Sequence, residues 1–302
     1  MAPRTTAGIG VIRTLEAVAV QQQPDALRAA LDQRGGVLAR TIAPPSTRRH
    51  APALNTDLQR AEHYATRYAN AAARDTRALM LATNAVTARA AADATLAMWA
   101  RYERHDPEVN LDPLSLARRV QRARAAATPE WGSRDQLVAQ WAQDARVAVH
   151  RAAAGVQAAN GSTRDLAHAV ADAARAEEWK LARILRTEAA FSFNAAQQES
   201  IVALAEEYPD VRKRWTELVD DRTGRPLDKR VAADSLALHG QVALPDGLFV
   251  MPAGVSSPPP GTWLPYPPNR PNDRAVVTPW RRGWGIPAWT VGRDGATRRR
   301  LV

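Results

Sequence analysis

Residues 54–103 read LNTDLQRAEHYATRYANAAARDTRALMLATNAVTARAAADATLAMWARYE, a stretch of fifty residues without a glycine or a proline. Alanine, arginine and leucine are frequent in it, and all three are strong helix formers. As one helix the stretch would run about 75 Å at 1.5 Å per residue. The stretch therefore predicts a single long helix or two collinear helices.

The apolar residues of this stretch follow a heptad only in part. The seam would consist of Leu54, Leu58, Ala61, Ala65, Tyr68, Ala72, Leu79, Ala82, Val86 and Leu96. Asp75, Arg89 and Asp93 interrupt this seam, which argues against a sustained dimeric coiled coil. Because an alanine-rich face allows close packing, we expect the stretch to be one helix of a bundle.

On its N-terminal side, the long stretch is preceded by a second helical segment and a linker. The composition predicts a helix at about 11–33, ended by Gly35 and Gly36. Residues 41–52, TIAPPSTRRHAP, contain three prolines and no helical period, as is typical of a linker.

On its C-terminal side, further helices are expected at about 112–127 and 132–158, the second ended by Asn160-Gly161. Ser162 then opens another helix, because Asp165 three residues later completes a capping-box pattern. This helix can extend to about residue 208.

The composition changes near Pro209, which divides a helical part from a part rich in proline and tryptophan. We therefore predict an α+β fold, with a mostly helical N-terminal two thirds followed by a small β-containing domain and an extended Pro/Trp/Arg-rich tail. The expected regions are 1–52 (basic N-terminal helix and linker), 53–208 (helical bundle), 209–280 (small β-containing region, with the 183–208 helix) and 281–302 (basic tail).

The formal net charge of +10 is concentrated at the two ends of the chain. Residues 1–50 carry 7 Arg and 3 acids, and residues 273–302 carry 7 Arg and 2 acids. Such ends suit DNA phosphates or acidic protein surfaces. The chain has no cysteine, and no apolar run approaches the roughly 18 residues that would cross a bilayer, so we expect no membrane partner.

Patterns typical of catalysis are not found in the sequence. The six histidines are scattered, without a His-Glu-x-x-His pair, and there is neither a phosphate-binding glycine loop nor a Gly-x-Ser-x-Gly elbow. Asp220-Asp221 followed by Thr223-Gly224 indicates a turn after a strand, and His239 before Gly240 indicates another turn. We predict no catalytic, cofactor-binding or metal-binding residues, and hence not an enzyme.

Tryptophans and arginines alternate near the C-terminus, in a region with too much proline for helix. Such residues either stack on nucleic-acid bases or anchor a protein interface. Docking is the favoured interpretation, either onto the chain's own domain or onto a neighbouring subunit. A chain cut after about Val277 would then remain folded. The interaction candidates are Trp280, Arg281, Arg282, Trp284 and Trp289.

A series of short motifs follows in order from residue 186. It comprises Arg-Thr-Glu at 186–188, Asn194, Lys-Arg-Trp at 213–215, Asp220, His-Gly at 239–240 and Pro-Pro-Asn-Arg-Pro-Asn-Asp-Arg at 267–274. This order resembles the Mu F-type phage head morphogenesis domain of minor capsid proteins. In that family an Arg-Thr-Glu helix precedes a Trp-containing strand, and a His-Gly turn and a Pro-Pro…Cys-Arg-Cys ending follow. The resemblance covers about residues 180–280, a third of the chain.

Three positions depart from the family pattern, because Gly224, Asp273 and Ala275 stand where its cysteines are expected. A metal or disulfide role of those cysteines cannot operate in this chain, which indicates that the remaining polar and aromatic frame is architectural. The family-motif residues are Arg186, Thr187, Glu188, Trp215, Asp220, His239, Gly240, Pro268 and Arg274. Glu188 is expected either to accept from Arg222 or Arg274, or to lie solvated on a helix face.

The resemblance implies a structural minor capsid protein of a tailed phage, associated with the portal and acting in head assembly and in packaging or ejection of DNA. Its partners would be the portal protein, the major capsid protein and a scaffolding protein. It would reside in the virion, at the portal vertex or in the capsid interior, and in the host cytoplasm during assembly. An internal DNA-binding virion protein is the alternative, and an enzyme module is a third.

Overall fold

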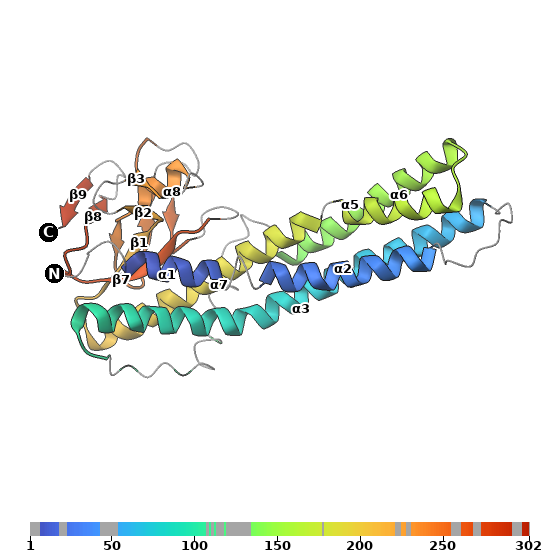
Figure 1. Ribbon diagram of the computed structural model, residues 1–302. Coiled ribbons are helices and arrows are strands. Elements are labelled where there is room, and N and C mark those ends of the chain that lie inside the picture. The colour runs from blue at the N-terminus through green and yellow to red at the C-terminus, as the bar shows by residue number, and fades with distance from the viewer. Residues whose placement is uncertain are drawn as a thin grey trace. The chain divides into compact units, whose positions relative to one another are not determined.

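A computed structural model describes most of the chain, and its fold is α+β, with long helices in the first two thirds and small sheets after them (Figure 1). The described residues are 7–17, 23–42, 54–106, 109, 112, 118, 134–176, 178–220, 225–227, 231–254, 261–267, 273–291 and 298–301. Most of the helix predicted at 112–127 and most of the linker predicted at 41–52 lie outside them.

The chain forms two compact units, each assembled from separate segments. Unit 1 comprises Met1–Gln21, Ala82–Ala127 and Arg186–Val302, and unit 2 comprises Gln22–Leu81 and Thr128–Leu185. The helices are α1 (Ala7–Leu15), α2 (Gln23–Ile42), α3 (Leu54–Glu103), α5 (Arg134–Ala158), α6 (Thr163–Arg175), α7 (Glu178–Glu207) and α8 (Ala233–Leu238). The prediction of one continuous helix over 54–103 is confirmed by α3.

The signals that end one helix and start the next lie where the sequence predicts them. Asn160 adopts a left-handed conformation with φ 51° after α5. The amide of Gly161 then donates to the carbonyl of Val156 at 2.9 Å, and the amide of Asn160 donates to the carbonyl of Gln157 at 3.1 Å. These two bonds form a Schellman motif. Ser162 and Asp165 form the predicted capping box at the start of α6.

Two predicted helices are each divided in the structure. The helix expected at 11–33 is the pair α1 and α2, and α2 continues through Gly35 and Gly36 to Ile42. A glycine in a helix costs only about 1 kcal/mol, so it does not have to end one. The helix expected from Ser162 to about residue 208 is likewise the pair α6 and α7.

The core of unit 2 is formed by α2, α3, α5, α6 and the start of α7. The helix α3 contributes small side chains to it, including buried Ala65, Ala69, Ala72 and Ala73. Larger side chains come from α3 itself, such as Tyr68 and Met80, and from other helices, with Trp141 of α5 and Leu181 of α7 almost fully buried. The predicted alanine-rich packing face is therefore present, and small side chains allow close helix approach.

The strands belong to unit 1. They are β1 (Arg212–Thr216), β2 (Val219–Asp220), β3 (Arg225–Pro226), β4 (Val242–Ala243), β5 (Phe249–Val250), β6 (Trp263–Leu264), β7 (Val276–Trp280), β8 (Ala288–Val291) and β9 (Arg298–Leu301). Among the described residues, the largest sheet has the order β4-β1-β7 and is antiparallel, with Arg214 opposite Thr278. The pairs β2-β3, β5-β6 and β8-β9 are also antiparallel.

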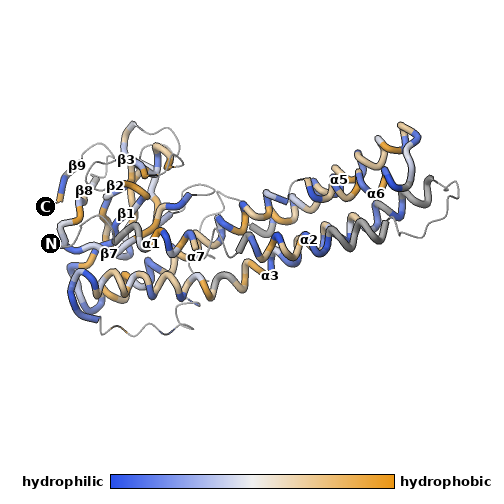
Figure 2. The backbone as a smooth tube through the Cα atoms, viewed as in Figure 1, coloured by the Kyte–Doolittle hydropathy of each residue, from blue (hydrophilic) through white to orange (hydrophobic). Residues whose placement is uncertain are grey.

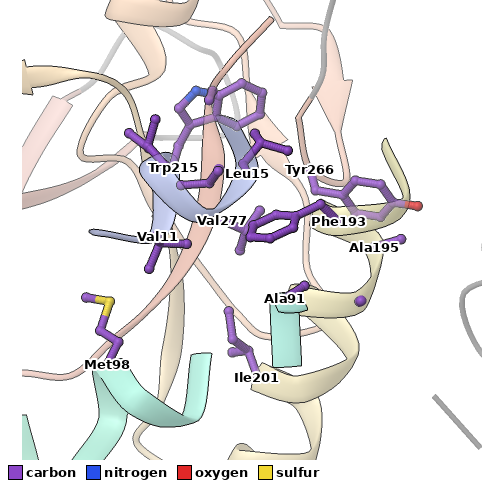
Figure 3. Close-up of a cluster of buried hydrophobic side chains, with 14 of the residues drawn as sticks. Val11, Leu15, Ala91, Met98, Phe193, Ala195, Ile201, Trp215, Tyr266 and Val277 are labelled. Atoms are coloured by element: carbon purple, nitrogen blue, oxygen red, sulfur yellow. The ribbon is translucent and has the colours of Figure 1, made fainter. Parts of the chain in front are cut away.

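One hydrophobic cluster within unit 1 joins these strands to α1, α7 and the second half of α3. Figure 3 shows Val11 and Leu15 of α1, Phe193 of α7, Trp215 of β1 and Val277 of β7 meeting in it. The second half of α3 adds side chains such as Met98 and Trp99. Segments from both ends of the chain therefore bury apolar area in the same core, at about 25 cal/mol per Å².

Hydropathy along the helices alternates between hydrophilic and hydrophobic residues (Figure 2). Such alternation is typical of helices with one packed face and one solvent face. Among the helices that the structure describes, none is both long and apolar enough to cross a membrane.

Candidate functional site

The motif residues gather around β1, the middle strand of the largest sheet. Four of the five residues of β1 are buried, and Trp215 is fully buried. The Trp215 ring packs edge-on against Phe249 of β5, with 5.3 Å between the ring centroids. Its backbone amide donates to the carbonyl of Gln241 at 2.8 Å, and its carbonyl accepts from the amide of Gly240 at 2.9 Å. The turn at 239–240 is thereby fixed to β1.

A chain of hydrogen bonds continues from Trp215 to the segment before β7. The indole Nε1 donates to Ser235 of α8 at 3.4 Å, and the Ser235 hydroxyl donates to Asp273 Oδ1 at 3.3 Å. The same Asp273 oxygen accepts from the amide of Ala275 at 3.1 Å. Asp273 and Ala275 are two of the positions where the family has cysteines, and both are buried here. At a position where the resemblance places a cysteine, the Asp273 carboxylate thus accepts a hydrogen bond from the backbone.

Asn194 of α7 connects the long helix to β7. Its Nδ2 donates to the carbonyl of Ala275 at 3.1 Å and to that of Ala190 at 3.0 Å. Its Oδ1 accepts from the amide of Val277 at 2.8 Å. Both polar atoms of a fully buried amide are used, and two of the bonds satisfy the strand backbone. This residue fixes the register between α7 and β7.

A second polar group lies around His239. The Arg214 guanidinium donates to the carbonyl of Pro287 at 3.0 Å and to the Thr216 hydroxyl at 3.1 Å, and Thr216 shares a hydrogen bond of 2.7 Å with Thr278. The His239 Nδ1 accepts from the amide of Glu217 at 3.1 Å. The other ring nitrogen, Nε2, lies 3.4 Å from Nη2 of Arg214.

The predicted turn at His239 and Gly240 is confirmed. Gly240 has φ 84°, a left-handed conformation that favours glycine. The Trp289 indole packs against it, so that a Cβ at Gly240 would lie 3.0 Å from the indole Nε1. That Nε1 donates to the carbonyl of His239 at 2.7 Å. Trp289 therefore docks on the chain's own turn.

Lys213 of β1 is a fully buried lysine. Its ammonium donates to Gln198 Oε1 and to the carbonyl of Pro265, both at 2.7 Å, and lies 5.1 Å from the centre of the Phe249 ring. Burial lowers the pKa of Lys213 to about 7, while the charge of Asp246 opposes this shift.

The remaining motif residues have different surroundings. Glu188 is fully buried, so the expectation of a solvated glutamate is wrong. Arg274 donates to Glu16 at 2.6 Å, which joins the segment before β7 to the residues after α1. Asp220 lies in β2 opposite Arg225, whereas Pro268 and Arg222 lie outside the described residues. Arg186 and Thr187 belong to α7.

Most of the C-terminal interaction candidates contact unit 1 itself. Trp280 is buried and donates to the carbonyl of Ile286 at 3.1 Å. Trp284 stacks on Tyr102 at 4.7 Å between centroids and donates to Glu103. Arg281 pairs with Glu103 at 3.0 Å and with Asp210. We call Trp280, Arg281 and Trp284 the C-terminal latch. Their contacts fix the end of β7 and the segment after it to the end of α3.

The residues that receive the latch had no assigned role in the sequence prediction. Trp99 is fully buried, packs on Tyr208 at 4.5 Å between centroids, and has Arg281 6.0 Å from its own ring centre. The only signal in the sequence was the group Trp99, Tyr102 and Glu103 within the last turn and a half of the long helix. Asn194 and Lys213 belong to the motif series, but nothing in the sequence indicated that either side chain would be buried.

The arrangement is an internal hydrogen-bonding frame. The bonds described above join β1, α8, α7 and β7 to one another, and buried polar groups with such partners hold a specific geometry. Within the described ranges, no group of three or more His, Asp or Glu side chains is placed to hold a metal ion.

Comparisons with protein-family models, with curated proteins and with solved structures give no match for this chain.

Proposed function

We propose that this chain is a structural minor capsid protein of a tailed phage that binds at the portal vertex. It acts there in head assembly and in packaging or ejection of DNA. Its partners are the portal protein and the major capsid protein, with a scaffolding protein during assembly. It resides in the virion, and in the host cytoplasm while heads assemble.

One observation supports the proposal most directly. The ordered series that resembles the Mu F-type domain has members far apart in sequence, and Asn194, Trp215 and Gly240 converge on one buried frame. Convergence is what a shared fold requires of its motif residues.

We propose a structural role rather than a catalytic one for these residues. The polar atoms of Asn194 and the Asp273 Oδ1 are bonded to backbone or to neighbouring side chains of the same unit. Bonds of this kind hold the geometry of a buried frame. An enzyme module remains the less favoured class.

In this proposal, the surface that contacts a capsid partner consists of residues that are not part of the C-terminal latch. Trp280 and Arg281 have partners inside unit 1, whereas Trp263 of β6 is 49 % exposed. Leu244 and Leu248, on either side of the turn between β4 and β5, are also exposed large apolar side chains. Exposed aromatic side chains are common anchors of protein interfaces.

Particle assembly tests the proposal. The chain is co-expressed with the portal and capsid proteins of the phage that would encode it, and copies per purified particle are counted by quantitative mass spectrometry. We expect low-copy incorporation and copurification with the portal ring. Trp263→Thr should reduce incorporation, whereas the control Leu81→Gln, at an exposed leucine of α3, should not. Finding the protein only free in the cytosol would contradict the proposal.

An internal DNA-binding virion protein remains the second candidate, favoured by the charge excess at the two ends of the chain. Arg281 argues against part of it, because that guanidinium is held by Glu103 and Asp210. Release of the protein together with DNA on ejection, from particles whose portal ring is retained, would favour this candidate.

A further inference from the structure

The first third of α3 has an exposed face of unusual composition. Between residues 59 and 74, the side chains classed as exposed are Gln59, Arg60, His63, Arg67, Asn70 and Arg74. Every one of them can donate a hydrogen bond. None is acidic and none is apolar, although the opposite face of the same segment is buried in the core of unit 2.

Three arginines on this face are evenly spaced. Arg60, Arg67 and Arg74 follow one another at intervals of seven residues, just under two helical turns, so they lie on one side of α3. Successive arginines are about 10 Å apart along the axis at 1.5 Å per residue. We call these three residues the arginine stripe. On the neighbouring helix α5, Arg146 donates to Asn70 at 3.2 Å and adds a positive charge at the edge of the stripe.

The acids described near Arg67 and Arg74 do not neutralise these two arginines. In the part of the chain that the structure describes, no carboxylate pairs with Arg67 or Arg74. Glu62 is bonded to His150 of α5 at 2.6 Å, and Asp75 is bonded to Arg34 of α2. Among the described residues, the acidic groups next to Arg67 and Arg74 therefore have other partners, and both arginines are exposed; Arg60 is also exposed, with its guanidinium carbon 5.9 Å from the centre of the Tyr64 ring.

We propose that the arginine stripe binds the sugar-phosphate backbone of double-stranded DNA. Phosphate oxygens only accept hydrogen bonds, which suits a face made of donors, and charge-assisted pairs with arginine are strong. A protein partner would instead need apolar or aromatic anchors, and the exposed face between residues 59 and 74 has none. Contacts of this kind position DNA without reading its sequence. The inference does not rest on the portal proposal, and the stripe consists of residues outside the two basic chain ends.

Two triple variants of the full-length chain test this site. The first is Arg60→Gln, Arg67→Gln and Arg74→Gln, which keeps helix propensity because glutamine and arginine are similar helix formers. The control is Arg28→Gln, Arg89→Gln and Arg164→Gln, at exposed arginines of α2, α3 and α6. Both variants remove three positive charges from the net charge of +10. Circular dichroism checks that each is folded.

Affinity for a labelled DNA duplex is measured by fluorescence anisotropy between about 50 and 200 mM salt. Each lost phosphate contact should reduce the steepness of the slope of log K against log salt by about 0.9. The slope of the stripe variant should therefore be less steep than that of the wild type by about 2 to 3. The control should keep the wild-type slope, and duplexes of different sequence should behave alike. Equal losses in both variants, or none in either, would overturn the proposal. Wild-type binding to polyglutamate but not to DNA would assign the stripe to an acidic protein instead.

Discussion

Arg104 follows the last turn of α3 in a left-handed conformation with φ 61°, a position that helices usually give to glycine. A side chain in that conformation costs about 1 kcal/mol or more. Arg104→Gly should therefore raise the free energy of unfolding by about 0.5–1 kcal/mol, as measured by urea denaturation. The control is Arg101→Gly, inside the last turn, which should lower it by about 1 kcal/mol. Equal destabilisation by both would contradict the prediction.

Lys213 should make stability depend on pH, because its pKa is about 7 in the folded protein against an ordinary 10.5. Between these values the unfolded chain holds a proton that the folded chain has lost, so the free energy of unfolding rises with pH. Below pH 7 both states are charged and the full burial penalty is present.

Lys213→Met removes this dependence. Urea denaturation at several pH values between 7 and 10 should show the wild type gaining stability relative to the variant as pH rises. One proton allows at most about 1.4 kcal/mol per pH unit. A difference between the two proteins that stays constant over this window would refute the prediction.

Four helices of unit 2 each contribute one polar side chain to a hydrogen-bonded cluster. The Tyr68 hydroxyl of α3 donates to Glu178 of α7, and burial followed by this bond raises the pKa of Tyr68. Arg175 of α6 donates to Glu178 at 3.2 Å and to Asp32 of α2. The carboxylate of Glu178 therefore has two partners, one of which is charged.

Tyr68→Phe should lower the free energy of unfolding by about 1.5–3 kcal/mol, because it removes a bond to a charged group in a partly buried site. The measurement is chemical denaturation. The control is Tyr64→Phe, one turn earlier on α3 and partly buried, which should change stability by less than about 0.5 kcal/mol. Similar effects of the two changes would show that the shared carboxylate does not hold the helices.

Asn194 gives the corresponding test for the contact between α7 and β7. Asn194→Leu leaves the amide of Val277 and the carbonyl of Ala275 without their side-chain partner in a buried site. We expect a loss of about 2–5 kcal/mol, and a melting temperature lower by several degrees. Asn194→Asp retains the acceptor for Val277 but buries a charge, so it should also destabilise. A neutral effect of both would show that packing alone sets the register.

The C-terminal segment belongs to the core of unit 1, which changes the expectation for a shortened chain. The residues Thr278, Pro279 and Trp280 of β7 are buried, and the latch covers Trp99. A chain ending at Val277 should therefore lose native packing rather than remain folded, with little near-ultraviolet circular dichroism signal. Removal of residues after Val291 should be much milder. A well-packed protein ending at Val277 would contradict the structure.

The helical part was predictable because local signals decide it. Fifty residues without a breaker fix α3, and Asn160-Gly161 and the Ser162–Asp165 box fix the boundary between α5 and α6. These features depend on neighbours three to six residues apart, which the sequence displays directly. The α+β class also followed from the change in composition near Pro209.

What the chain's sequence determines by itself, then, is where helices form and where strands replace them. Only the tertiary structure decides that α1 packs with β7, that Asp273 bonds Ser235, and that Lys213 is buried with a lowered pKa. Each of these depends on segments distant in sequence, and neither burial nor a hydrogen-bond partner at that distance leaves a local pattern. The arginine stripe illustrates both contributions. Its seven-residue spacing is written in the sequence, but its exposure is set by which face of α3 the alanines bury.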